Sequence, residues 1–215
     1  MNIFLRPDIG AAYDDYYQTE FGKEVDRIEK EIISGFLDNV SGEEMVDLGC
    51  GTGHWTEFFL KKGFKMKGVD ISESMLHIAQ KKHIDTEFIL ADATNLPFEN
   101  ESYSLVASVT MLEFIEDQDK AIREMYRILK KDGWLIMGFL NADSITGKNK
   151  DSDEIFKHAC FFNRNTIRSK FKSFELLETK CGVYLNDDLS ILDNIRNYQN
   201  TEPVFIGALF KKSRI

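Results

Sequence analysis

The sequence has little cysteine and no long apolar run. Its three cysteines are odd in number and widely spaced, and no CxxC or Cys/His pattern with metal-ligand spacing occurs. This pattern predicts a reducing compartment and no bound metal. No apolar stretch approaches the roughly 18 residues that suggest a membrane span, so we expect none. The first residues, MNIFLRPDIGAAYDDYY, contain acidic side chains and no continuous apolar core, which excludes a secretory signal. Together these absences predict a cytoplasmic protein.

Positive charge is also scarce. The 215-residue chain has 27 lysines and arginines against 36 aspartates and glutamates, which gives a net charge of −9. A general nucleic-acid binder normally presents a basic face. The acidic balance therefore argues against nucleic acid as a partner.

What the sequence does contain is a regular alternation of short apolar runs with helical patterns. Such alternation implies right-handed crossover connections and a parallel sheet with helices on both faces. The expected strands cover residues 44–49, 65–71, 86–92, 103–110 and 134–140, and the expected helices cover residues 22–39, 56–63, 72–82 and 117–131.

The last third departs from this rhythm. Residues 141–156 are polar and rich in Ser, Asp and Lys, which predicts a mobile connection. A short helix is expected at 163–171. The runs 173–180 and 204–212 read as two late strands, and residues 186–198 read as a helical insertion between them.

The most informative stretch is VDLGCGTGHW, residues 46–55, in which three glycines follow a short apolar run. An ordinary strand-to-helix turn needs only one glycine. A phosphate-binding loop would continue with Gly-Lys-Ser/Thr, and no lysine follows here. In the dinucleotide pattern GxGxxG, the third glycine would fall on His54, which is too bulky for close helix–strand packing. The spacing GxGxG therefore disfavours a nicotinamide-dependent oxidoreductase.

Several motifs accompany this loop in order along the chain. They are VDLGCGTG (46–53), GVDIS (68–72), LADATNLPF (90–98), SLVASVTMLEFIED (104–117) and GWLIMGFLN (133–141), with a weaker likeness in HACFFNRNTIRSKF (158–171) and in the final strand. GxGxG alone is a weak signal, but the ordered set is specific. The chain resembles the class I S-adenosylmethionine-dependent methyltransferases, in particular the small-molecule type that includes the ubiquinone/menaquinone-biosynthesis enzymes.

The resemblance implies a doubly wound, Rossmann-like α/β fold. Its sheet would have seven mostly parallel strands, with the last strand, around 204–210, running antiparallel beside the fifth. It also implies one methyltransferase domain over residues 1–215, with a helical cover (1–40), a cofactor-binding core (41–141) and an acceptor-pocket segment with the last two strands (142–215).

The resemblance further implies a binding site for S-adenosylmethionine, a ligand that has no phosphate and so needs no basic residue in the glycine loop. Asp70 is expected to accept the ribose hydroxyls and Asp92 the adenine amine, although each could instead be a cap or an Asx-turn. The predicted cofactor-binding residues are Asp47, Gly49, Cys50, Gly51, Asp70, Ile71, Met75, Asp92, Ala93, Thr110 and Tyr17.

No fixed catalytic residue is required, because methyl transfer is an in-line displacement at an activated carbon and depends mainly on positioning. A base matters only if the acceptor must lose a proton. His158 and Glu113 are the candidates, although His158 could be an exposed or capping residue and Glu113 could simply start a helix. The aromatic run from Tyr13 to Phe21 is expected either to close over the cofactor or to pack an N-terminal helix onto the sheet.

The predicted reaction is transfer of a methyl group to a small-molecule acceptor, with S-adenosylhomocysteine as product. No Asn-Pro-Pro-Tyr/Phe tetrapeptide follows the fourth strand, which argues against methylation of an amino group on a nucleobase. A tRNA-modifying enzyme and a non-catalytic S-adenosylmethionine-binding regulator remain alternatives. The sequence does not identify the acceptor or its reacting atom.

Overall fold

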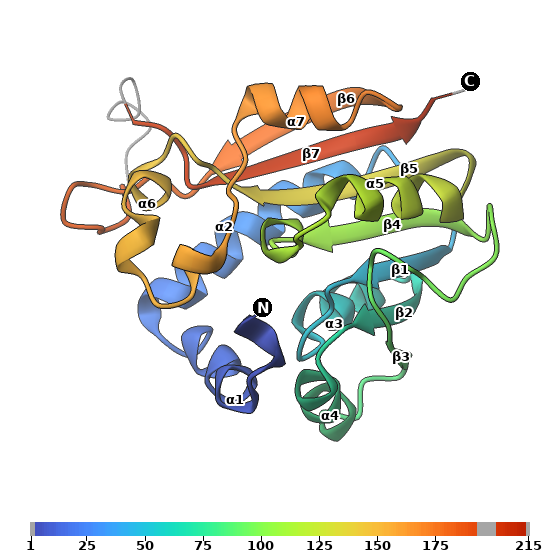
Figure 1. Cartoon of the computed structure of the whole chain (residues 1–215), viewed down its shortest axis with the longest axis horizontal. Coiled ribbons are helices and arrows are strands. Elements are labelled where there is room, and N and C mark those ends of the chain that lie inside the picture. Colours follow the sequence, from blue (N-terminus) through green and yellow to red (C-terminus); the bar gives the residue numbers. More distant parts are fainter. Residues whose placement is uncertain (1–2, 193–200, 214–215) are drawn as a thin grey trace.

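Residues 3–192 and 201–213 are described by a computed structural model of the chain (Figure 1). Its strands are β1 (Glu44–Leu48), β2 (Lys65–Asp70), β3 (Glu87–Leu90), β4 (Tyr103–Val109), β5 (Leu129–Leu140), β6 (Phe174–Gly182) and β7 (Phe205–Lys212). Its α-helices are α1 (Pro7–Tyr16), α2 (Glu20–Leu37), α3 (His54–Lys61), α4 (Glu73–Lys81), α5 (Gln118–Ile128), α6 (Ile145–Lys148) and α7 (Arg164–Lys170). Short 3-10 turns are η1 (Ile3–Leu5), η2 (Leu112–Phe114), η3 (Lys150–Ser152) and η4 (Phe156–His158).

The strands form one seven-stranded sheet in the order β3-β2-β1-β4-β5-β7-β6. β7 pairs antiparallel with both β5 and β6, and the other neighbouring pairs are parallel. Gly138 of β5, for example, lies opposite Gly207 of β7. The expected antiparallel last strand beside the fifth is therefore confirmed. The carboxyl ends of the parallel strands point toward α1 and α6 (Figure 1).

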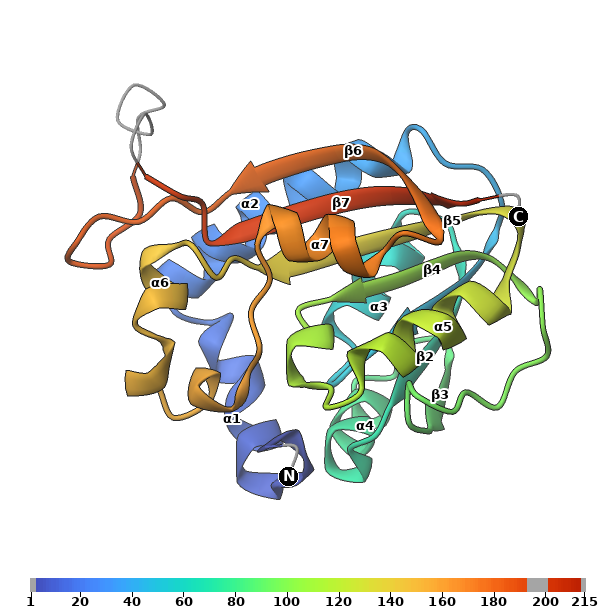
Figure 2. The ribbon, with the colours of Figure 1, turned by 45° about the horizontal axis from the view of Figure 1, so that its top comes forward.

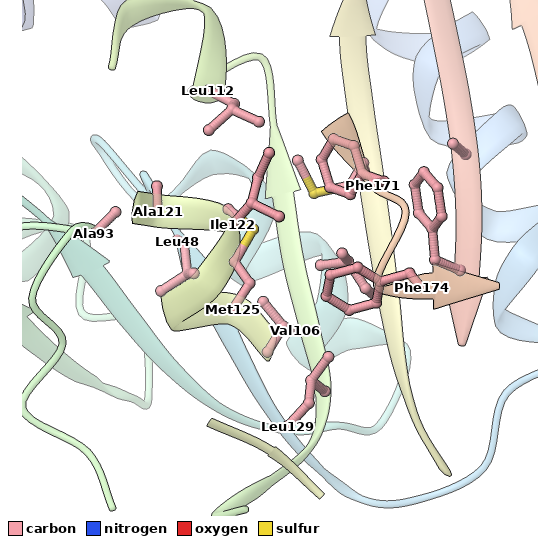
Figure 3. Packing of buried hydrophobic residues seen from close by; sticks show 14 of the residues in the cluster. Leu48, Ala93, Val106, Leu112, Ala121, Ile122, Met125, Leu129, Phe171 and Phe174 are labelled. Carbon is pink, nitrogen blue, oxygen red and sulfur yellow. The ribbon is translucent and has the colours of Figure 1, made fainter. Parts of the chain in front are cut away.

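Helices cover both faces of the sheet, because successive residues of each inner strand point to opposite faces. Along β5, Leu135 and Met137 join the cluster under α5 and α7, while Ile136 joins the cluster under α2 and α3. Figure 3 shows side chains of α5, among them Met125, gathered over β4, with Phe171 beside them. All five of these residues are buried, at 2% exposure or less. The two apolar layers hold the sheet rigid, and the ends of its strands remain free to form a site.

One expected boundary was wrong. The helix predicted over 117–131 ends at Ile128, and the fifth strand begins at Leu129 instead of residue 134. Leu129 already pairs with Tyr103, and the register shifts before Leu105. Asp132 has φ of 59°, a conformation that suits a bulge or a turn. The Asp-Gly signal, interpreted as the turn before the strand, therefore marks an irregularity inside it.

The connections after β5 also differ from expectation. The polar stretch 141–156 contains α6 and η3, and Ser144 caps α6 by accepting from the Gly147 N–H at 3.0 Å. Of the helical insertion predicted at 186–198, the described part is not helical: Leu185 bridges to Ile191 around a tight turn in which Leu189 has φ of 65°. The remainder of that prediction, residues 193–198, lies outside the described residues.

Candidate cofactor and acceptor site

The glycine loop leaves the end of β1 and turns back against β2. The Gly49 and Cys50 N–H groups donate to the Val69 carbonyl at 2.8 and 3.0 Å. Gly49 and Gly51 have φ of 76° and 52°, values that favour glycine. A Cβ on Gly49 would lie 2.1 Å from Met111 Cγ, so this position also has no room for a side chain. Gly51 instead faces a cavity, where a Cβ would meet only Met75, at 3.6 Å.

Asp70, the last residue of β2, is tied to this loop by its carboxylate. Its Oδ2 accepts from the Gly51 N–H and its Oδ1 from the Ser72 N–H, each at 2.8 Å. Burial raises the pKa of Asp70, and the backbone N–H donors, chiefly those of Ser72 and Gly51, oppose that shift. Ser72 is the cap of α4, where its hydroxyl accepts from the Met75 N–H. Asp70 is therefore held in one orientation while each oxygen keeps a lone pair for a further donor.

A cavity open to solvent lies at the carboxyl ends of β1, β2 and β4. This is the edge where open α/β sheets bind ligands. Eight of the predicted residues line it: Gly49, Gly51, Asp70, Ile71, Met75, Asp92, Ala93 and Thr110. Thr110 is a β-branched residue with φ of 52°, and its N–H donates to the Gly138 carbonyl at 2.8 Å. Such a conformation costs free energy and is typical of ligand sites.

Three predicted residues lie elsewhere. Asp47 is buried behind the loop, where it accepts from the Thr56 hydroxyl at 2.7 Å, and burial raises its pKa to about 7. Cys50 is buried, which raises the pKa of its thiol well above the usual value. Tyr17 stacks on His54, with ring centroids 3.9 Å apart. None of the three is among the residues that line the cavity.

Sequence reasoning missed several apolar residues of the lining. Phe4 reaches the cavity from η1 and packs edge-on against Phe114, with ring centroids 4.8 Å apart. Tyr13, predicted only as part of the aromatic cover, lines the cavity in place of Tyr17. Met111 follows β4 and packs on the glycine loop. No local signal identifies these residues, because their neighbours in space are far away in the sequence. The other apolar residues outside the prediction are Val69, Ala91, Val109 and Ile115.

A second, broader cavity adjoins the first and shares Ile71, Asp92, Phe114 and Ile115 with it. Both catalytic candidates line it. His158 is exposed at the end of η4. Glu113 is 1% exposed and accepts from the Leu140 N–H at 2.7 Å through Oε1. Burial raises its pKa to about 7. Glu113 does not start a helix, because it is the middle residue of the short turn η2 and the next α-helix begins at Gln118.

The N-terminal cover is bonded to the glycine loop. Asp14 of α1 accepts from the Thr52 hydroxyl at 2.6 Å and pairs with Lys82, the residue just after α4, at 2.7 Å. The ring of His54, on which Tyr17 stacks, bonds to Asp26 of α2 at 2.6 Å. These contacts connect α1 and α2 to the same loop that contributes two glycines to the first cavity.

Comparisons with known proteins agree with this geometry. Residues 46–137 match the family model described as a methyltransferase domain. The whole fold matches a crystal structure from Thermotoga maritima, which is described as an S-adenosylmethionine-dependent methyltransferase, possible histamine N-methyltransferase. The match has a TM-score of 0.73 and 27% sequence identity, and it covers 97% of this chain and 99% of that one. The chain belongs to the class I S-adenosylmethionine-dependent methyltransferases.

Relatives of this methyltransferase extend the family match. An uncharacterized protein of Methanocaldococcus jannaschii is 30% identical over 84% of the chain and 89% of its own length. A demethylmenaquinone methyltransferase of Thermotoga maritima is 34% identical over 124 residues, and a ubiquinone/menaquinone biosynthesis C-methyltransferase of Campylobacter jejuni is 35% identical over 101. The chain spans 54% and 43% of these two enzymes' lengths.

Two further observations concern the part of the methyltransferase that the structure describes. No helix there is both long enough and apolar enough to span a bilayer. Within residues 3–192 and 201–213, no three His, Cys, Asp or Glu side chains come together in a way that could hold a metal ion.

Proposed function

We propose that this methyltransferase binds S-adenosylmethionine in the first cavity and methylates a small molecule in the second. The observation that carries the proposal is the contact between the two cavities, which share four lining residues at the carboxyl edge of the sheet. The cofactor supplies a methyl group on a sulfonium, which is already activated toward a nucleophile. The chain then needs to bind, orient and desolvate the two reactants.

The residues of the first cavity fit the proposed cofactor. Gly51 leaves its wall open next to the backbone, as a methionine tail requires. Asp70 keeps free lone pairs for ribose hydroxyls. Asp92 accepts from the Thr94 N–H through Oδ1 at 2.8 Å, so it forms the Asx-turn considered above, and Oδ2 is available for the adenine amine. Ile71 and Met75 supply apolar contact.

Any proton transfer from the acceptor would take place in the second cavity. Glu113 and His158 are its candidates to hold or take a proton. The rings of Phe4 and Tyr13 lie over the first cavity, where they can exclude water and face a cation. Asp47 and Tyr17 would act indirectly, by supporting the glycine loop and the cover.

The proposed division of the chain into a cover (1–40), a core (41–141) and an acceptor segment (142–215) assigns one of these roles to each part. The three cysteines, all unpaired, support a cytoplasmic setting for the enzyme.

Thermal-shift measurements with S-adenosylhomocysteine and with NAD test the cofactor. A ligand that binds only the folded state at 100 times its Kd stabilises it by about 2.7 kcal/mol. We expect a shift with S-adenosylhomocysteine and none with NAD, and the reverse result would contradict the proposal.

Turnover separates an enzyme from a regulator. Incubation with S-adenosylmethionine and a metabolite pool should release S-adenosylhomocysteine, and incubation with tRNA should not. Binding without turnover in any pool would favour the non-catalytic regulator, and turnover with tRNA alone would favour the tRNA-modifying enzyme.

A further inference from the structure

Among the charged side chains that line the cavity proposed for the acceptor, acidic ones predominate. The cavity's four carboxylates outnumber its two basic groups, Lys157 and His158, and Lys157 is already paired with Glu154 at 2.7 Å. A cleft lined by one sign of charge attracts molecules of the other sign. The acidic residues are Asp92, Glu113, Glu116 and Asp117.

Glu113 stands apart from the other three because it is 1% exposed, whereas Asp92, Glu116 and Asp117 are exposed. Oε1 accepts from the Leu140 N–H, but Oε2 is buried and has no hydrogen-bond partner among the described residues. The Glu113 carbonyl accepts from the Cys160 N–H at 2.7 Å, so the residue is fixed between the end of β5 and the segment after η4. A buried carboxylate oxygen without a donor requires an explanation.

A second carboxyl group approaches from α2. Glu29 is 8% exposed, and burial raises its pKa to about 8, with further contributions from Asp26 and Glu113 that outweigh the opposing effect of Lys30. In Figures 1 and 2 the segment between α6 and α7 lies beside α1, on the side where β4 and β5 end. Glu113 therefore interacts electrostatically with a second buried carboxyl group from α2, and among the described residues no lysine, arginine or histidine bonds to its side chain.

Much of the remaining lining is apolar. Ile3 and Leu5 of η1 face the cavity together with Phe114 and Ile115, which follow Glu113 in the sequence. An acceptor that fits this lining has an apolar body and one group that can donate to a carboxylate. An ammonium is the strongest such donor, because hydrogen bonds between charged groups are shorter and stronger than neutral ones.

We propose that the methyl acceptor is a primary or secondary amine with an apolar body, and that Glu113 binds its nitrogen through Oε2. This rests on the function proposed above. Glu113 takes one proton from the bound ammonium, which frees the nitrogen lone pair. That pair forms the bond to the methyl carbon of S-adenosylmethionine while the carbon–sulfur bond breaks and its electrons go to sulfur. The products are the N-methylated ammonium and neutral-sulfur S-adenosylhomocysteine, and the proton on Glu113 passes to solvent.

Matched amines and alcohols test the proposal on the full-length chain loaded with S-adenosylhomocysteine. The probes are 2-phenylethylamine against 2-phenylethanol, and hexylamine against 1-hexanol, titrated calorimetrically at about pH 8, where Glu113 is ionised and the amines are still charged. At least one amine should bind about tenfold more tightly than its alcohol, a difference of about 1.4 kcal/mol. If neither amine is preferred, the proposal is overturned.

Glu113→Gln removes the charge and keeps an oxygen for the Leu140 N–H. We expect it to lose the amine preference and to keep its affinity for S-adenosylhomocysteine. Glu99→Gln, an equal change of net charge at an exposed position before β4, is the matched control and should keep the preference. Equal amine binding by Glu113→Gln and the wild type would overturn the assignment to Glu113. If Glu113→Gln does not fold, the amine and alcohol comparison on the wild type decides alone.

The same titrations separate the two proposals. Failure of the wild type to bind S-adenosylhomocysteine would remove the proposed function itself. Normal binding of S-adenosylhomocysteine without any amine preference would remove only the amine assignment.

Discussion

Gly51 and Gly63 have the same backbone requirement and different surroundings. Both have positive φ, 52° and 95°. A Cβ on Gly63, just after α3, would meet nothing within 4 Å, whereas Gly51 lines the proposed cofactor cavity. Substituting each glycine in turn therefore distinguishes the effect of backbone strain from the effect of lost binding space. Asp70 and Asp92 form a second such pair, since both line the cavity but Asp70 is 8% exposed and Asp92 is exposed.

Alanine at each glycine tests this separation. Both Gly51→Ala and Gly63→Ala should lower the free energy of unfolding by about 1–2 kcal/mol, the cost of a left-handed conformation in a residue with a Cβ. Only Gly51→Ala should also weaken binding of S-adenosylhomocysteine, by about tenfold, because its methyl group occupies the cavity wall. Denaturant melts and calorimetry measure the two effects. Equal losses of affinity in both variants would argue against a cofactor site at Gly51.

Asp70→Asn should weaken S-adenosylhomocysteine binding by about 1.5–3 kcal/mol, because the ribose loses a charged acceptor. The single oxygen of the Asn amide can replace only one of the two carboxylate oxygens that accept from the Gly51 and Ser72 N–H groups. Some stability should therefore be lost as well. Calorimetry on Asp70→Asn and Asp92→Asn provides the comparison. Asp92→Asn should cost less, since it keeps an oxygen for the Thr94 N–H and its site is exposed. An unchanged affinity in Asp70→Asn would remove Asp70 from the site.

At the scale of elements, α1, the proposed cover, is attached to the glycine loop by one aspartate. Asp14 bonds to Thr52 in the loop and to Lys82 just after α4, whereas the side chain of its neighbour Asp15 makes no hydrogen bond or ion pair with the described residues. A cover attached in this way should respond when the loop binds a ligand. The segment 141–162 is bonded less directly, through the Glu113 carbonyl and the pairing of Asn141 with Phe162.

Hydrogen exchange tests the attachment. Asp14→Ala should increase amide exchange in α1 relative to the wild type, because two contacts are lost, and Asp15→Ala should not. Similar exchange in the two variants would show that Asp14 does not hold the cover.

Ligand binding should order both covering segments. Adding S-adenosylhomocysteine should protect the aromatic run 13–21 and the stretch 141–162 from exchange beyond the protection of the glycine loop. If exchange in both segments is unchanged by the ligand, they are simply packed elements and not a lid.

At the scale of the whole molecule, three buried carboxyl groups make stability depend on pH. Burial raises the pKa of Asp47 and of Glu113 to about 7 and that of Glu29 to about 8, from ordinary values of 3.8 and 4.5. A carboxyl whose pKa is raised on folding stabilises the folded state when protonated. This contribution is complete at low pH and is lost as pH rises through the folded pKa.

Melting temperatures measured from about pH 5 to about pH 9 should therefore fall, most steeply between about pH 5 and pH 7, and level off above about pH 8, where the folded groups are also ionised. Glu29→Gln should flatten the profile and be the more stable protein at the alkaline end, because it has no charge to bury. Glu73→Gln, an exposed position on α4, is the control and should leave the slope unchanged. A profile that rises over this range would contradict the burial of these groups as protonated acids.

The sequence by itself determined the parts of this protein that depend on local pattern. Hydrophobic periodicity located the parallel strands, and the motif order implied the antiparallel β7, as the sheet confirms. The spacing of Gly49, Gly51 and Asp70 directed attention to one sheet edge, since strand ends that share an edge meet in space. The boundary near Leu129 and the insertion after Leu185 were wrong because strand pairing overrode the local turn and helix signals. The stretch 141–156, predicted as a mobile connection, also differed, because it contains α6 and η3.

The tertiary structure alone decided which side chains complete the site. Phe4, from η1 near the N-terminus, packs on Phe114. Tyr13 lines the cavity in place of Tyr17, which stacks on His54, and Asp47 accepts from Thr56 behind the loop. Such choices depend on which surfaces meet after the helices pack on the sheet, and no local pattern encodes them. The unpartnered oxygen of Glu113 is of the same kind, because a missing partner is a property of the whole packed fold.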